Sequence, residues 1–297
     1  MRNGVRAALA VAMGAVAMGA AAMAPLPVAA QKDVAAASEA ASDPAPDSAL
    51  SSVLAHPRRA ADRARDAYRH PAETLAFFRV EPGMSVVDFT PSGGWYSRVL
   101  IPYLGPQGTY IGLNPAVSDG ATGYMAALRD AAGTLPGKAR EWVGEGAATV
   151  IGANLGSVPE ALDGTVDRVL IFREMHNIRR NGWLHDTMLT ARRLLKADGM
   201  VGIVQHRAKP DAPAAYTMGD KGYQREKDVV AFMDAYGFDL VGSSEINANP
   251  RDPANWEGGV WTLPPTYAGA GEDAARRAEL DAVGESDRMT LLFRKRA

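Results

Sequence analysis

Hydrophobic and polar positions alternate along most of this chain in short blocks, and the blocks predict strands and helices in turn. Short apolar runs that end at turn residues are typical of strands buried on both faces of a sheet. The predicted strands are Met84–Phe89, Thr109–Leu113, Thr149–Ile151, Val166–Phe172, Met200–Gln205, Phe238–Ile246 and Met289–Arg294.

Helical periodicity fills most of the intervals between these runs. From 183 to 195, for example, apolar residues recur on one face of a helix. The predicted helices are Arg58–Arg69, Ala72–Arg79, Trp95–Leu104, Asp119–Ala132, Trp183–Leu195 and Glu226–Tyr236. Strands that alternate with helices pair in parallel, so we expect an α/β fold with a doubly wound, mostly parallel sheet and helices on both faces.

The first 30 residues differ from the rest. Arg2 and Arg6 precede an uncharged apolar run, Ala8–Ala24, and small residues follow at 28–30. This order is typical of a signal peptide, so we expect cleavage after Ala30 and a periplasmic or secreted protein. A membrane anchor is the alternative, but the run is short of the roughly 20 residues that span a bilayer.

Two further segments depart from the alternation. Residues 31–56 are rich in Ala, Ser, Asp and Pro, and we expect a disordered linker there because they can bury little apolar surface. The domain should then occupy 57–297. Within it, 247–286 is long and rich in Pro and Gly, which predicts an insertion folded over the ends of the strands.

Composition narrows the classes of partner. The chain has no cysteine, which excludes disulfides, thiolate metal sites and a lipid anchor on cysteine. Its 32 Lys and Arg residues face 34 Asp and Glu residues, a formal net charge of −2, without a basic block. We therefore expect a small-molecule substrate, no nucleic-acid partner and no stable membrane insertion. The oligomeric state stays open.

The turn after the first strand is the first candidate site. Ligands of open α/β sheets bind outside the carboxyl ends of the strands, where glycines allow close approach and a helix offers free N–H groups. Asn114 ends the second strand, where nucleotide-binding sheets place an acid for the ribose hydroxyls. A tight turn without a ligand is the alternative. The candidate ligand-binding residues are Asp88, Thr90, Ser92, Gly93, Gly94 and Asn114.

Polar residues also follow the fourth and fifth strands. Four of them come within five residues of an apolar run, which packing alone does not require, and they are Arg173, Glu174, His176 and Asn177. His206 and Arg207 follow the next strand. Histidine has an unperturbed pKa near 6.5, so His176 is a candidate general base.

These motifs together resemble the class I S-adenosylmethionine (SAM) methyltransferases, in particular an exported and poorly characterised branch. Besides the turn after Asp88, the resemblance lies in Arg-His-Pro at 69–71, Phe-Arg-Glu-Met-His-Asn at 172–177, Gln-His-Arg-Ala at 205–208 and Gly-Glu-Ser-Asp-Arg-Met at 284–289. It runs from about Arg58 to the C-terminus. It implies a Rossmann-like, seven-stranded sheet whose last strand is antiparallel.

The resemblance also implies a function: SAM-dependent methyl transfer to an unidentified small or medium-sized acceptor. Asp88, Thr90, Ser92, Gly93, Gly94 and Asn114 would then hold the cofactor SAM. The catalytic residues would be His176, Arg173 and His206, and the substrate-binding residues Arg69, His70, Asn177 and Arg207. Thr90 and Ser92 stand where the family carries glycines, and Asn114 where it carries an acid.

Two other functions remain open from the residues. The altered glycine turn, the missing acid and the predicted export favour a catalytically silent protein that binds a small ligand or a protein partner in the periplasm. A metal-dependent hydrolase would use His176, His206 and Glu245. The chain has no His pair four residues apart on a helix, so we expect no metal site.

Overall fold

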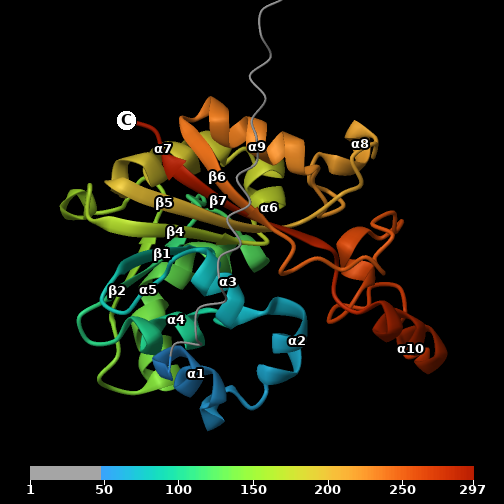
Figure 1. Ribbon diagram of the computed structural model, residues 1–297, viewed down its shortest axis with the longest axis horizontal. Coiled ribbons are helices and arrows are strands. Elements are labelled where there is room, and N and C mark those ends of the chain that lie inside the picture. Colours follow the sequence, from blue (N-terminus) through green and yellow to red (C-terminus); the bar gives the residue numbers. More distant parts are fainter. Residues whose placement is uncertain (1–47) are drawn as a thin grey trace, which may run out of the picture. The chain divides into compact units, whose positions relative to one another are not determined.

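The computed structural model describes residues 48–297 (Figure 1). The predicted signal peptide and residues 31–47 of the predicted linker lie outside the described residues. No helix within 48–297 has the length and apolar character needed to cross a bilayer.

Seven strands form one sheet at the centre of the domain. The strands are β1 (Ser85–Phe89), β2 (Thr109–Asn114), β3 (Thr149–Asn154), β4 (Val166–Phe172), β5 (Leu195–His206), β6 (Phe238–Ser244) and β7 (Arg288–Lys295). Their order is β3-β2-β1-β4-β5-β7-β6. All neighbours pair in parallel except β7, which is antiparallel to both β5 and β6. The predicted mostly parallel, seven-stranded sheet with an antiparallel last strand is confirmed.

Helices cover both faces of the sheet, also as predicted. One face carries α1 (Ser48–Ala55), α3 (Pro71–Phe77), α4 (Ser97–Leu104) and α5 (Gly123–Val143), and the other α6 (Met175–Arg180), α7 (Leu184–Leu194) and α9 (Glu226–Ala235) (Figure 1). The neighbours Val86 and Val87 of β1 are fully buried in the two different cores. This follows from the period of two in a strand, which points successive side chains to opposite faces.

Several boundaries differ from the prediction. Residues 48–55 of the predicted disordered linker form α1, because Leu50 is buried against the domain. The predicted helix Arg58–Arg69 is broken into two 3-10 turns, η1 (Pro57–Arg59) and η2 (Arg63–Arg65), and a short α2 (Asp66–Arg69). Within this segment Arg59 is fully buried, and its guanidinium binds Asp66 at 2.7 Å and the Leu54 carbonyl.

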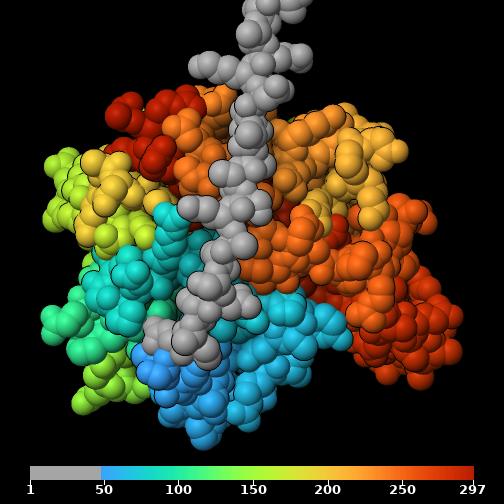
Figure 2. Space-filling model, in the orientation of Figure 1, coloured from blue at the N-terminus to red at the C-terminus, as the bar shows by residue number. Residues whose placement is uncertain are grey.

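The insertion 247–286 contains η4 (Gly259–Thr262) and α10 (Ala274–Val283). In Figure 2 its orange-to-red surface adjoins the blue-to-cyan surface of the N-terminal helices, and the Arg65–Glu285 ion pair at 2.6 Å joins the two. Residues of this segment line a cavity together with residues at or just after the ends of β1, β4 and β5.

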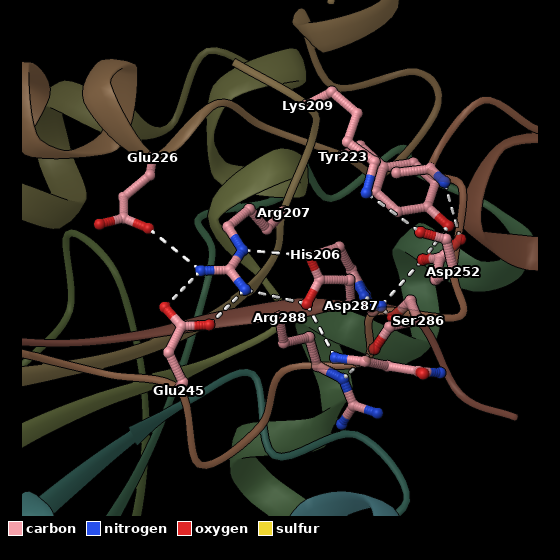
Figure 3. Close-up of polar contacts among 12 residues, drawn as sticks. His206, Arg207, Lys209, Tyr223, Glu226, Glu245, Asp252, Ser286, Asp287 and Arg288 are labelled. Carbon is pink, nitrogen blue, oxygen red and sulfur yellow. Dashed lines mark hydrogen bonds and ion pairs between the residues drawn. The ribbon is translucent and has the colours of Figure 1, made fainter.

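One buried carboxylate fixes this insertion to the sheet. Asp252 is fully buried, and its Oδ2 accepts hydrogen bonds from the Tyr223 hydroxyl at 2.9 Å and the Asp287 N–H at 2.8 Å (Figure 3). Its Oδ1 accepts from the Ala254 N–H and the Trp256 indole, both at 2.9 Å. Tyr223 follows β5 and Asp287 precedes β7, so the carboxylate joins the insertion to both.

We expect Asp252→Asn to lower the free energy of unfolding by about 2–5 kcal/mol, because an amide N–H₂ would face two buried donors and leave them unpaired. Urea denaturation measures the change. The exposed Asp211, changed to Asn, serves as the matched control. Equal stability of the two variants would contradict the role assigned to Asp252.

Candidate active site

A cavity of about 560 Å³ opens where β1, β4 and β5 end. The order of the sheet reverses between β1 and β4, so the connections that follow these strands diverge and leave a crevice. The residues before β7 reach the same edge because β7 starts where the parallel strands end, with Arg288 paired to His206. Residues of η4 and the loop after it, including Trp261, also line the cavity.

The turn after β1 supplies one wall. Of the candidate residues in this turn, Asp88, Thr90, Ser92 and Gly93 line the cavity. Thr90 and Ser92 adopt left-handed conformations, with φ of 53° and 50°. The Oγ1 of Thr90 is buried without a hydrogen-bond partner among the described residues, and a Cβ at Gly93 would meet no atom within 4 Å. This turn thus offers an open surface and an unused polar atom.

The other two predicted cofactor residues do not reach the cavity. At Gly94, a Cβ would overlap the indole ring of Trp142 in α5, so a protein side chain fills that space. Asn114 is 1% exposed and absent from the lining, and its carbonyl accepts the Leu155 N–H. The end of β2 is therefore closed by protein.

Asp88 is buried and accepts a hydrogen bond from the Tyr110 hydroxyl at 2.7 Å. Burial raises the pKa of Asp88 to about 7, although the Tyr110 hydrogen bond by itself lowers it. The Ser97 hydroxyl lies 2.8 Å from that of Tyr110 and completes the chain of polar contacts. At neutral pH, Asp88 therefore carries only part of a negative charge.

The cluster after β4 forms the opposite wall. Its four polar residues, Arg173, Glu174, His176 and Asn177, all line the cavity. Arg173 has φ of 62°, and its N–H donates to the Val204 carbonyl at 2.7 Å. Burial raises the pKa of Glu174 to about 7, although the Asn177 amide donates to its Oε2 at 2.8 Å. Glu174 is thus a carboxylate poised to exchange a proton near neutral pH.

The two predicted histidines meet at this wall. The rings of His176 and His206 lie 5.7 Å apart, and the Ser286 hydroxyl lies 2.6 Å from Nδ1 of His206. Burial, followed by the charge of Arg180, lowers the pKa of His176 to about 4. Burial and His176 also lower the pKa of His206 well below its usual value. Both rings are therefore neutral at neutral pH.

The predicted substrate residues divide into two pairs. Arg69 and Asn177 line the cavity, whereas His70 and Arg207 do not. His70 has φ of 40° and lies between α2 and α3. Arg207 contacts Asp287 at 3.1 Å and Glu245 at 2.6 Å and 2.7 Å (Figure 3), and these carboxylates raise its pKa.

This contact also bears on the hydrolase hypothesis. The side chain of Glu245 is 66% exposed, binds Arg207 and does not line the cavity with the two histidines. Within residues 48–297, no group of three or more His, Asp or Glu side chains is arranged to hold a metal ion. The ligand set that a metal-dependent hydrolase would need is not brought together.

The sequence analysis missed several lining residues. They come from the broken helix, the starts of α4 and α5 and the run before β7, and they include Asp62, Arg65, Arg98, Tyr124 and Glu285. Glu285 belongs to the Gly-Glu-Ser-Asp-Arg-Met motif. The place of this motif before an antiparallel last strand was the sequence signal that could have put Glu285 at the cavity. Arg65 and Glu285 are 220 residues apart in sequence, and no local pattern pairs them.

No protein-family model and no curated protein matches this chain. Solved structures are similar at low identity. A SAM-dependent methyltransferase from Aquifex aeolicus is 17% identical, and the match covers 67% of this chain and 93% of that one with a TM-score of 0.47. A geranyl diphosphate C-methyltransferase from Streptomyces coelicolor, solved in complex with S-adenosyl-L-homocysteine, is 13% identical. The match covers 82% of this chain and 84% of that one, with a TM-score of 0.47.

A third similar structure is the cyclase SpnF, which is 17% identical over 82% of this chain and 86% of that one, with a TM-score of 0.47. Methyltransferases of the family that the sequence resembles are therefore among the similar solved structures, and so is an enzyme of another reaction. At these identities and TM-scores the similarity carries no argument for the reaction, which has to be argued from the cavity.

The raised pKa of Asp88 predicts a pH-dependent stability. The unfolded carboxyl loses its proton near pH 4 and the folded one near pH 7, so the free energy of unfolding should fall as the pH rises through this window. Asp88→Asn keeps the acceptor for Tyr110 but cannot ionise, so between pH 5 and pH 8 it should lose less stability than the wild type.

The difference should be on the order of a few kcal/mol at pH 8, since one pKa unit corresponds to about 1.4 kcal/mol. Chemical denaturation at both pH values measures it, with Asp211→Asn as the control. Parallel pH profiles for wild type and Asp88→Asn would show that Asp88 is ionised in the native state at pH 5.

Proposed function

We propose that this protein transfers a methyl group from SAM to a small or medium-sized acceptor inside the cavity. The observation that carries this proposal is the position of the cavity at the switch point, with the β1 turn on one side and the cluster after β4 on the other. A transfer between two molecules requires that both be held together in a fixed orientation.

The β1 turn supports the donor side. Thr90 and Ser92 offer hydroxyls, and the open space at Gly93 allows a ligand to approach the main chain. The residues proposed to hold SAM are therefore Asp88, Thr90, Ser92 and Gly93. Gly94 is left out of this set because the Trp142 ring fills the space beside it, and Asn114 because the end of β2 is closed by protein.

SAM, when bound, would supply an electrophilic methyl group on its sulfonium. The chain's own residues then have to orient the acceptor, take up its proton and exclude water. Glu174 suits the proton transfer better than the predicted His176, because a base works best when its pKa lies near the working pH. His176 and His206, as neutral rings, and Arg173 would orient the acceptor by hydrogen bonds.

A second candidate is a binding protein that keeps the fold without methyl transfer, acting in the periplasm behind the predicted signal peptide. The observations that favour it are the Trp142 ring over Gly94 and the exclusion of Asn114 from the cavity. The first removes a contact expected in the turn after β1, and the second removes the contact expected at the end of β2. Cofactor binding and turnover separate the two candidates.

Calorimetric titration of SAM and S-adenosylhomocysteine into protein starting at Gln31 tests the donor site. We expect micromolar binding, which Gly93→Val should weaken at least ten-fold because the added side chain fills the open space. Gly137 in α5 also has open space around it, so Gly137→Val is the matched control. No binding at millimolar ligand would contradict the methyltransferase proposal.

Turnover is tested by S-adenosylhomocysteine release against a panel of small acceptors. Once an acceptor is found, Glu174→Gln should lower kcat by about 10²–10⁴, the usual contribution of a positioned base. Asp211→Asn should leave kcat unchanged. If Glu174→Gln keeps full activity while His176→Ala does not, the proton passes to His176. SAM binding without turnover of any acceptor would favour the binding protein.

A further inference from the structure

The arginines beside the cavity outnumber the carboxylates that pair with them. Glu285 alone binds Arg65 at 2.6 Å, Arg288 at 2.8 Å and Arg69 at 3.3 Å. These three guanidinium groups lower the pKa of Glu285 to about 2 against the opposing effect of its burial. One negatively charged carboxylate is thus paired with three positively charged guanidinium groups.

The other acids of the cavity do not correct this excess. Asp62 is engaged by Arg98 through two hydrogen bonds of 2.6 Å and 2.8 Å. Burial raises the pKa values of Asp88 and Glu174 to about 7, so each carries only part of a charge at neutral pH. The cavity therefore keeps a net positive charge.

Arg69 has donors to spare. Its side chain is 2% exposed, it lines the cavity, and its guanidinium lies 4.7 Å from the centre of the Trp95 ring. Only Nε binds Glu285, and neither Nη atom has a hydrogen-bond partner among residues 48–297. A buried donor without a partner is destabilising, and more so when it is charged. A ligand with hydrogen-bond acceptors would therefore satisfy the free Nη donors of Arg69 in the cavity wall.

Arg173 is a second unpaired cation in the same cavity. Its guanidinium makes no hydrogen bond or ion pair with any described residue. Burial, and then the charge of Arg173, lower the pKa of Arg69 to about 8. The two guanidinium groups thus repel each other, and the one fully charged acid near both of them, Glu285, is shared with Arg65 and Arg288.

We propose that the cavity binds a small molecule through an anionic group, a carboxylate or a phosphate, held by Arg69 and Arg173. The planar guanidinium fork matches the paired oxygens of such groups and gives the stronger, charge-assisted hydrogen bonds. The anion would supply acceptors to the free Nη atoms and offset the repulsion between the two arginines. The anion site stands independently of methyl transfer, whereas its assignment to the methyl acceptor rests on the proposed function.

The anionic group could come from either of two ligands. One is the acceptor itself, and the other is SAM, through the carboxylate of its amino-acid end. The probe is inorganic phosphate, titrated calorimetrically into protein starting at Gln31 at pH 7 and compared with chloride at equal ionic strength. We expect saturable phosphate binding that is at least ten-fold weaker in Arg69→Gln and in Arg173→Gln. Arg129→Gln, at an arginine outside the cavity, should bind phosphate as the wild type does.

Arg69→Lys covers the case in which Arg69→Gln does not fold, as checked by circular dichroism. It keeps the charge but loses the fork, so phosphate binding should weaken several-fold without being abolished. Phosphate that binds no better than chloride would overturn the proposal. Equal phosphate affinity of the wild type and the folded Arg69 and Arg173 variants would also overturn it.

A second titration of phosphate, with S-adenosylhomocysteine at saturation, distinguishes the two sources. Competition would assign the anion site to the amino-acid end of the methyl donor, and simultaneous binding would assign it to the acceptor. If S-adenosylhomocysteine does not bind at all, the methyltransferase proposal fails, while the phosphate titration still decides the anion site.

Discussion

The buried carboxylate of Asp252 is the contact on which the rest of the site depends. By accepting the Asp287 N–H, it fixes the three residues before β7, and each of them engages a different part of the molecule. Glu285 binds arginines of the broken N-terminal helix and Arg288, Ser286 contacts His206, and Asp287 binds Arg207. One buried acid thus positions a cavity wall assembled from both ends of the domain.

Burial explains the charge character of this wall. Removal from water disfavours the charged form of every side chain, so it raises the pKa of Asp88 and Glu174 and lowers that of His176 and His206. Arginine resists this neutralisation because its unperturbed pKa lies above 12. The same desolvation therefore leaves Asp88 and Glu174 only partly charged, the two imidazoles neutral and the guanidinium groups charged, which is why the cavity favours an anion.

The central strands could be predicted from the sequence because they are continuous apolar runs, and burial on both faces is a local property of such runs. The interruption of the helix at Arg58–Arg69 could not, because the contact of a buried Arg59 with Asp66 is not visible in hydrophobic periodicity. The same limit holds for the site. Residues that follow a strand were predicted, whereas Glu285 and Asp62 take part through partners far away in sequence or through a bend that periodicity does not reveal.

The turns after β1 and β4 share one backbone conformation and one kind of hydrogen bond to a neighbouring strand. Thr90 follows β1 and donates its N–H to Leu113 at the end of β2, and Arg173 follows β4 and donates to Val204 of β5. Both adopt left-handed conformations, which cost a residue with a side chain about 1–3 kcal/mol. Glycine would avoid this cost but would remove a hydroxyl and a guanidinium from the cavity. Since the hydrogen bonds to the neighbouring strands hold each turn in place, the strain is best understood as the cost of presenting two polar side chains to a ligand.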